Sequence, residues 1–147
     1  MVPETEIRFS WVYNKKLNPE INPSEFVELK EKCGGFIDLY EKYIVRILKS
    51  IEKNNEIWRR KFIPIYVVFA KTKSFSDPLT IKYRKDHKLM MLILIHELVH
   101  NNLVKKYENP SMAHAEVDRV FEAVLVDLEL GGFEEAINKM HNLRANK

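Results

Sequence analysis

The spacing of hydrophobic and polar residues along the chain predicts five helices and three strands. Apolar residues at intervals of three and four predict helices over 24–32, 36–51, 87–106, 112–130 and 133–144. Runs rich in β-branched and aromatic residues predict strands over 7–13, 62–70 and 79–84. Because the last two strands follow each other closely, we expect them to form a hairpin. The pattern predicts an α+β fold with a small antiparallel sheet of about three strands and four to five helices.

Neither a linker nor an internal repeat divides the 147 residues, so we expect one domain. Residues 1–60 supply an N-terminal strand and helices, residues 62–130 the core that carries the candidate chemistry, and residues 133–147 a C-terminal helix. A hydrophobic content of 46% excludes a disordered chain, and a net charge of +3 argues against a strongly basic nucleic-acid binder. The single cysteine excludes an internal disulfide and a cysteine-based zinc site.

The distribution of apolar residues predicts a cytoplasmic protein with no membrane partner. The longest apolar run, from Leu89 to Ile95, is much shorter than the roughly 20 residues that a membrane helix needs. The first residues lack the charged and then apolar order of a signal peptide. A composition rich in Lys, Glu and Ile and without Gln is typical of thermophile proteins.

The predicted helix over 87–106 contains His96-Glu97-Leu98-Val99-His100, which is the H-E-x-x-H pattern. Because the two histidines are four residues apart, they share one helix face and can direct ring nitrogens at one zinc ion. Glu97 lies about 100° around the helix, where its carboxylate can take a proton from a zinc-activated water. The motif therefore predicts one zinc ion per chain, bound by His96 and His100, with Glu97 as the catalytic base.

A third zinc ligand is expected on the predicted helix over 112–130, because a catalytic zinc has three protein ligands and one open position. At 100° per residue, Glu116 and His114 flank opposite sides of the apolar stripe of this helix, so either can reach the metal. Asp118 and Glu122 are expected to point toward solvent. The spacing alone leaves both Glu116 and His114 open as the third ligand.

The motif and the glutamate on the following helix together resemble the gluzincin class of zinc metallopeptidases. The small size and the β-ribbon before the motif resemble the minigluzincins, minimal catalytic domains found in archaea. Glu116-Val117-Asp118 with Phe121 is also similar to a helix of the ImmA/IrrE-like peptidases. The resemblance covers about Leu79 to Leu130 and implies a zincin-like domain with an active-site helix and a glutamate helix. It implies zinc binding by His96, His100 and Glu116, with Asp118 supporting a ligand and Glu97 as the general base.

The sequence departs from this family at one position. Many gluzincins carry an aspartate four residues after the ligand glutamate, where this chain has Val120. Asp118 instead follows His114 by four residues, so a zinc-binding His114 oriented by Asp118 is the alternative. If Glu116 binds the zinc, His114 becomes a catalytic residue that donates a hydrogen bond to the oxyanion. Tyr107 and His141 are weaker candidates for that role.

The predicted strand over 79–84 alternates apolar and polar residues, as an exposed edge strand does. We expect a peptide or protein substrate to pair with it at Thr80, Ile81 and Lys82. The expected activity is peptide-bond hydrolysis by a zinc metallopeptidase. Two further hypotheses are self-association and a zymogen-like latent state in which the N-terminal strand or the C-terminal helix covers the cleft.

Two other classes of function compete with this prediction. The first is a non-catalytic interaction module with a closed structural zinc site, in which His114 or Asp118 fills the fourth position. The second is nucleic-acid binding through the basic residues at 59–61 and 82–85, which predicts a steep dependence on salt and which we rank last.

Overall fold

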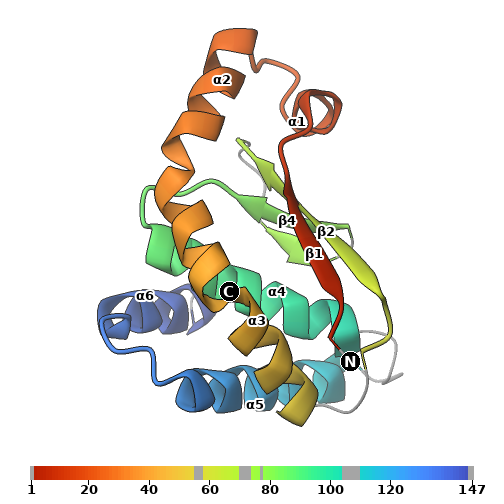
Figure 1. The fold of residues 1–147 in the computed structure, drawn as a ribbon, viewed down its shortest axis with the longest axis vertical. Coiled ribbons are helices and arrows are strands. Elements are labelled where there is room, and N and C mark those ends of the chain that lie inside the picture. The colour runs from red at the N-terminus through yellow and green to blue at the C-terminus, as the bar shows by residue number, and fades with distance from the viewer. Residues whose placement is uncertain (1, 55–57, 70–73, 77, 104–109, 146–147) are drawn as a thin grey trace.

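The protein folds into a small sheet with helices packed around it (Figure 1). The computed structural model describes residues 2–54, 58–69, 74–76, 78–103 and 110–145. These residues form six helices and one four-stranded sheet, so the α+β class is as predicted. In chain order the elements are β1 (Glu4–Arg8), α1 (Trp11–Leu17), α2 (Pro23–Lys32), α3 (Gly34–Asn54), β2 (Phe62–Val68), β3 (Phe75–Ser76), β4 (Leu79–Lys82), α4 (His87–Leu103), α5 (Pro110–Leu128) and α6 (Glu134–Ala145).

The sheet has the strand order β1-β2-β4-β3 and is mainly parallel, so the predicted antiparallel sheet is wrong. β1 pairs in parallel with β2, and β2 pairs in parallel with β4. The expected hairpin between 62–70 and 79–84 is therefore wrong as well. The reason is that the chain reverses its direction twice between these strands, first after β2 and again after β3. β3 is the strand that forms the antiparallel pair with β4, with Ser76 opposite Leu79.

β4 is an interior strand, which corrects the expectation of an exposed edge. β2 lies on one side of it and β3 on the other, and Thr80 and Ile81 are completely buried. The backbone N–H of Lys82 also donates to the Ser74 hydroxyl at 2.9 Å. These pairings occupy the hydrogen-bonding groups through which Thr80, Ile81 and Lys82 were expected to hold a peptide.

The segment predicted as a strand over 7–13 divides into the end of β1 and the start of helix α1. Ser10 caps α1, because its hydroxyl accepts a hydrogen bond from the backbone N–H of Tyr13 at 3.1 Å. Asn14 then fixes the helix against β2, since its buried amide donates to the carbonyl of Val67 and accepts from the N–H of Phe69. Capping and this tertiary contact outweigh the strand propensity of the aromatic and β-branched residues.

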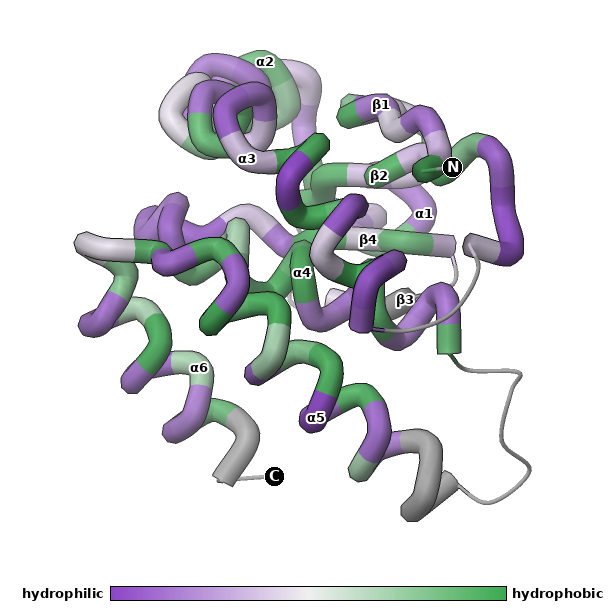
Figure 2. Tube along the Cα trace, turned by 60° about the horizontal axis from the view of Figure 1, so that its bottom comes forward, coloured by the Kyte–Doolittle hydropathy of each residue, from purple (hydrophilic) through white to green (hydrophobic). Residues whose placement is uncertain are grey.

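Helix α4 lies at the centre of the fold, where it contacts β3, β4, α3, α5 and α6 (Figure 2). Each residue from Leu89 to Ile95 is buried, which explains why this segment is apolar all around the helix. Along α5 and α6, hydrophilic and hydrophobic residues alternate within each turn, as in helices with one solvent-facing side (Figure 2). In the described part of the chain, no helix combines the length and the hydrophobicity needed to cross a membrane.

The start of α3 packs closely against the start of α4. A Cβ atom at Gly35 would lie 2.4 Å from Nδ1 of His87, so a larger residue here would require the His87 imidazole to move. α2 ends at Lys32 as predicted, whereas α3 begins at Gly34, two residues before the predicted start, so both glycines are helical. Gly35 thus lies beside the first residue of α4, the helix that carries the H-E-x-x-H motif.

Candidate metal centre

The H-E-x-x-H motif lies in the second half of α4 on the side that meets α5. α4 begins at an aspartate cap, where the Asp86 carboxylate accepts from the N–H of Leu89 at 3.1 Å. The ammonium of Lys139 on α6 donates to the same carboxylate at 2.8 Å and holds the pKa of Asp86 below its usual range. Cap and ion pair together anchor the end of α4 that precedes the motif.

Within the motif, burial separates the apolar residues from the polar ones. Leu98 and Val99 are completely buried, and their packing fixes the rotation of the helix. The side chain of His96 is only 10% exposed and that of Glu97 only 13%. Nδ1 of His96 lies 3.6 Å from Oε1 of Glu97, so the carboxylate stays beside the ring that is expected to bind the metal. His100 is partly exposed.

Two residues of α5 face the motif histidines. The ring centres of His100 and His114 are 5.2 Å apart, the same separation as between His96 and His100. Nε2 of His96 lies 3.8 Å from Oδ1 of Asp118. Asp118, which was expected to point toward solvent, is 49% exposed and also lies beside His96. The two helices run in opposite directions here, with His96 opposite Asp118 and His100 opposite His114.

Phe121, one turn beyond Asp118 on α5, packs against the ring of His96. Its ring is completely buried and meets the His96 ring edge-on, with 5.3 Å between centres and an angle of 88° between planes. This is a favoured arrangement for two aromatic rings, and it restricts the rotation of the imidazole. Phe121 therefore helps to determine where the nitrogens of His96 point.

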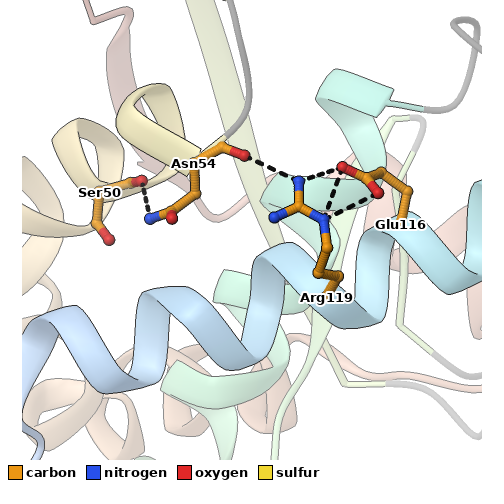
Figure 3. A network of polar contacts seen from close by, with 4 residues as sticks. All are labelled: Ser50, Asn54, Glu116 and Arg119. Atoms are coloured by element: carbon orange, nitrogen blue, oxygen red, sulfur yellow. Dashed lines mark hydrogen bonds and ion pairs between the residues drawn. The ribbon is translucent and has the colours of Figure 1, made fainter.

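Glu116, the third ligand implied by the gluzincin resemblance, is engaged by an arginine (Figure 3). Nε of Arg119 donates to both carboxylate oxygens of Glu116 at 3.0 Å, and its terminal nitrogen also pairs with Oε1. The same terminal nitrogen donates to the backbone carbonyl of Asn54, at the end of α3, at 3.2 Å. Arg119 was not predicted as a partner of Glu116, although the spacing of three residues between them is the signal of such a pair.

The donor set can be compared with what zinc requires. In a tetrahedral site the zinc–nitrogen distance is roughly 2.0–2.1 Å, so the ring centres of two imidazoles that bind the same ion lie about 5 Å apart. Both neighbouring ring pairs have this spacing. Among the described residues, however, no three His, Cys, Asp or Glu side chains converge closely enough to hold a metal ion. The helices thus bring suitable residues together, and binding requires rotation of their side chains.

The other residues singled out in the sequence lie elsewhere or have other partners. The Thr80 hydroxyl accepts from the Tyr13 hydroxyl and donates to the carbonyl of Pro78. Nε2 of His141 on α6 lies 2.9 Å from the Glu122 carboxylate, about one turn along α5 from Asp118. Tyr107 lies outside the described residues. Of the basic residues at 59–61, Arg59 binds the carbonyl of Asn101.

No protein-family model matches this chain, and searches of curated proteins and of solved structures find no significant match. The chemistry of the α4–α5 contact is therefore the basis for assigning a function.

Proposed function

We propose that this protein is a zinc-dependent metallopeptidase of the gluzincin type, which acts on a peptide or protein substrate. The observation that carries the proposal is the contact between α4 and α5. Both motif histidines meet polar side chains of α5 there, while the Glu97 carboxylate stays next to His96. Two histidines and an acid on an otherwise buried helix need such partners, because unpaired polar groups are costly to bury.

In this proposal some residues of the site would bind the zinc and others would take part in the reaction. Zinc, when bound, supplies a Lewis acid that lowers the pKa of a water and polarises the scissile carbonyl. His96, His100 and a third ligand from α5 would hold it. Glu97 would take the proton of the attacking water and return it to the leaving amine. Its low exposure strengthens its interaction with the charge that develops nearby. His114, exposed on the facing helix, would donate a hydrogen bond to the oxyanion.

The test is a comparison of zinc content and hydrolysis in the parent and in Glu97→Gln. We expect about one zinc per chain in both proteins, because Glu97 is not a ligand. Hydrolysis of labelled casein should fall at least about 100-fold in Glu97→Gln, the scale of a lost general base. Glu135→Gln, which changes an exposed carboxylate on α6 that pairs with Lys139, is the matched control and should keep full activity.

Equal hydrolysis by the parent and Glu97→Gln would refute the assignment of Glu97. Zinc binding without any hydrolysis would refute the metallopeptidase proposal for the intact chain. A latent enzyme makes a different prediction, since removal of α6 should then create an activity that depends on Glu97. α6 is a suitable cover because it packs on α4 and contacts α5 through His141 and Glu122.

One observation favours a second candidate, a closed structural zinc site. α5 presents two donors to the motif histidines, namely His114 and Asp118, and a zinc with four protein ligands has no open position. A hydroxamate distinguishes the two candidates in the cobalt-substituted protein. The absorption spectrum changes on adding a hydroxamate if a position is open, and it stays the same if four side chains fill the site.

A further inference from the structure

The polar residues of α5 divide between two faces of the helix. His114 and Asp118 are four residues apart, or about 40° around the helix, so they share a face. Glu116 is two residues from each of them, a rotation of about 200°, so it lies on nearly the opposite side of the helix. The contacts follow this division. His114 and Asp118 meet the histidines of α4, whereas Glu116 binds Arg119, which reaches the end of α3.

The distance between Asp118 and His96 suits two ligands of the same ion. Nε2 of His96 and Oδ1 of Asp118 are 3.8 Å apart. Two ligands of a tetrahedral zinc lie roughly 3.3 Å apart, so a small side-chain rotation brings this pair to the required spacing. The Asp118 side chain is 49% exposed and is therefore able to make such a rotation, whereas His96 is held by Phe121.

Glu116 has a different partner, which Figure 3 shows. Arg119 contacts both of its oxygens, which makes a charge-assisted pair between residues three apart on the same helix. Arg119 also satisfies the carbonyl of Asn54, one of the carbonyls left without a partner within a helix at its C-terminal end. Moving Glu116 to the metal would remove this support from the contact between α3 and α5.

We infer that Asp118 is the carboxylate ligand of the metal, and that Glu116 is a positioning residue that fastens α5 to α3 through Arg119. This inference rests on the metal site of the proposed function and changes its third ligand. It assigns the metal to His96, His100 and Asp118, and it leaves His114 to the oxyanion or to a fourth position. The orientation of α5, maintained by Glu116 and Arg119, then brings Asp118 to His96.

Zinc affinity separates the two carboxylates, and we would measure it by competition with a chromogenic chelator. Asp118→Asn and Glu116→Gln are matched variants, since each replaces one carboxylate by an amide of the same shape. We expect Asp118→Asn to weaken zinc binding at least about tenfold, the scale for losing even an outer partner of a ligand. Glu116→Gln should change the zinc affinity by less than about threefold. The reverse result, with zinc lost in Glu116→Gln and kept in Asp118→Asn, would overturn the inference.

The positioning role is tested without metal, by thermal unfolding in excess chelator. Glu116→Gln, Arg119→Gln and the double variant form a double-mutant cycle. If the two residues act as one pair, each single variant lowers the melting temperature and the double variant lowers it little further. Additive effects, or no effect of either substitution, would overturn the positioning role.

These results also separate the inference from the proposed function. One outcome is that Asp118→Asn loses zinc and the parent shows no hydrolysis that requires Glu97. This outcome supports Asp118 as a ligand and refutes the metallopeptidase proposal. Hydrolysis that depends on Glu97, with zinc lost only in Glu116→Gln, supports the enzyme and refutes the ligand assignment. A parent that binds no zinc refutes both, while the double-mutant cycle still decides the role of Glu116.

Discussion

Substitution of Phe121 by leucine tests whether the aromatic ring beneath His96 orients a metal ligand. The Phe121 ring is completely buried between α5 and α4 and meets the His96 ring edge-on. Leucine retains most of the apolar volume and removes the ring edge. Phe133→Leu is the matched control, because Phe133 is also buried and meets the ring of Tyr43 edge-on at 5.9 Å and 89°. Phe133 precedes α6 and pairs with α3 rather than with the motif.

The magnitudes follow from the contacts. Loss of an edge-on ring pair costs about 0.5–1.5 kcal/mol, and the small cavity left by leucine brings the total to about 1–2 kcal/mol. At roughly 2–4 °C per kcal/mol for a chain of this length, each variant should melt about 2–8 °C lower in excess chelator. Only Phe121→Leu should also weaken zinc binding, by roughly 10–100-fold, because it frees the ring of a ligand.

The assay is a pair of measurements on both variants: thermal unfolding with chelator present, and zinc competition without it. A similar loss of stability in the two proteins, with weaker zinc binding in Phe121→Leu alone, is the expected result. If Phe121→Leu binds zinc as tightly as Phe133→Leu does, the ring does not orient a ligand. The role given to His96 in the metal site would then be wrong, or the imidazole would be held by other contacts.

Three further predictions concern stability and reactivity. Lys139 holds the pKa of Asp86 below its usual range in the folded protein. The ionised Asp86 cap therefore stabilises the fold at pH values above the unfolded-state pKa of Asp86, about 3.9. This stabilisation is lost as the pH falls through the folded-state pKa. Asp86→Ala should therefore cost about 1 kcal/mol in urea unfolding at pH 7 and progressively less below about pH 4. Burial raises the pKa of Cys33 to about 11, so iodoacetamide at pH 8 should label this thiol rapidly only after unfolding, as mass spectrometry would show. Zinc at 100 times its Kd should raise the unfolding free energy by about 2.7 kcal/mol, and His100→Ala should abolish this gain in a calorimetric melt.

The helices could be predicted because their signals are local. The amphipathic spacing of α3 and the caps and breakers near the helix ends depend on neighbouring residues only. Most predicted boundaries differ from the observed ones by a few residues, as for the helix expected over 112–130 and found at Pro110–Leu128. The exception is α1, where a single cap and the buried amide of Asn14 decide the structure.

The direction of the strands could not be predicted in the same way. Strand propensity is the same for a parallel and an antiparallel neighbour, so β2 and β4 were recognised without their relative direction. The deciding element is β3, which has only two residues and leaves almost no pattern in the sequence. Its pairing turns an expected edge strand into an interior one and removes the predicted substrate contacts at Thr80, Ile81 and Lys82.

In the candidate site, too, the features set within one helix could be predicted and those set by packing between helices could not. The spacing within one helix fixes the relation of His96 and His100, and the structure keeps their rings 5.2 Å apart. The choice between Glu116 and its neighbours depends on which side of α5 faces α4. Because α5 packs against both α3 and α4, the flanks of its apolar stripe look equivalent in the sequence. The two flanks differ in their contacts, because Glu116 binds Arg119 and Arg119 donates to the carbonyl of Asn54 on α3.

His114 separates an open zinc site from a closed one. With His96, His100 and Asp118 as ligands, three side chains hold the ion and a fourth position stays open for water, as catalysis requires. Binding of His114 as well would close the site and leave Glu97 without a water to activate. In the open arrangement His114 lies beside His100 without binding the ion, as its exposed position on α5 permits. His114→Ala should then keep zinc and lose hydrolysis, while a closed site would lose the zinc itself.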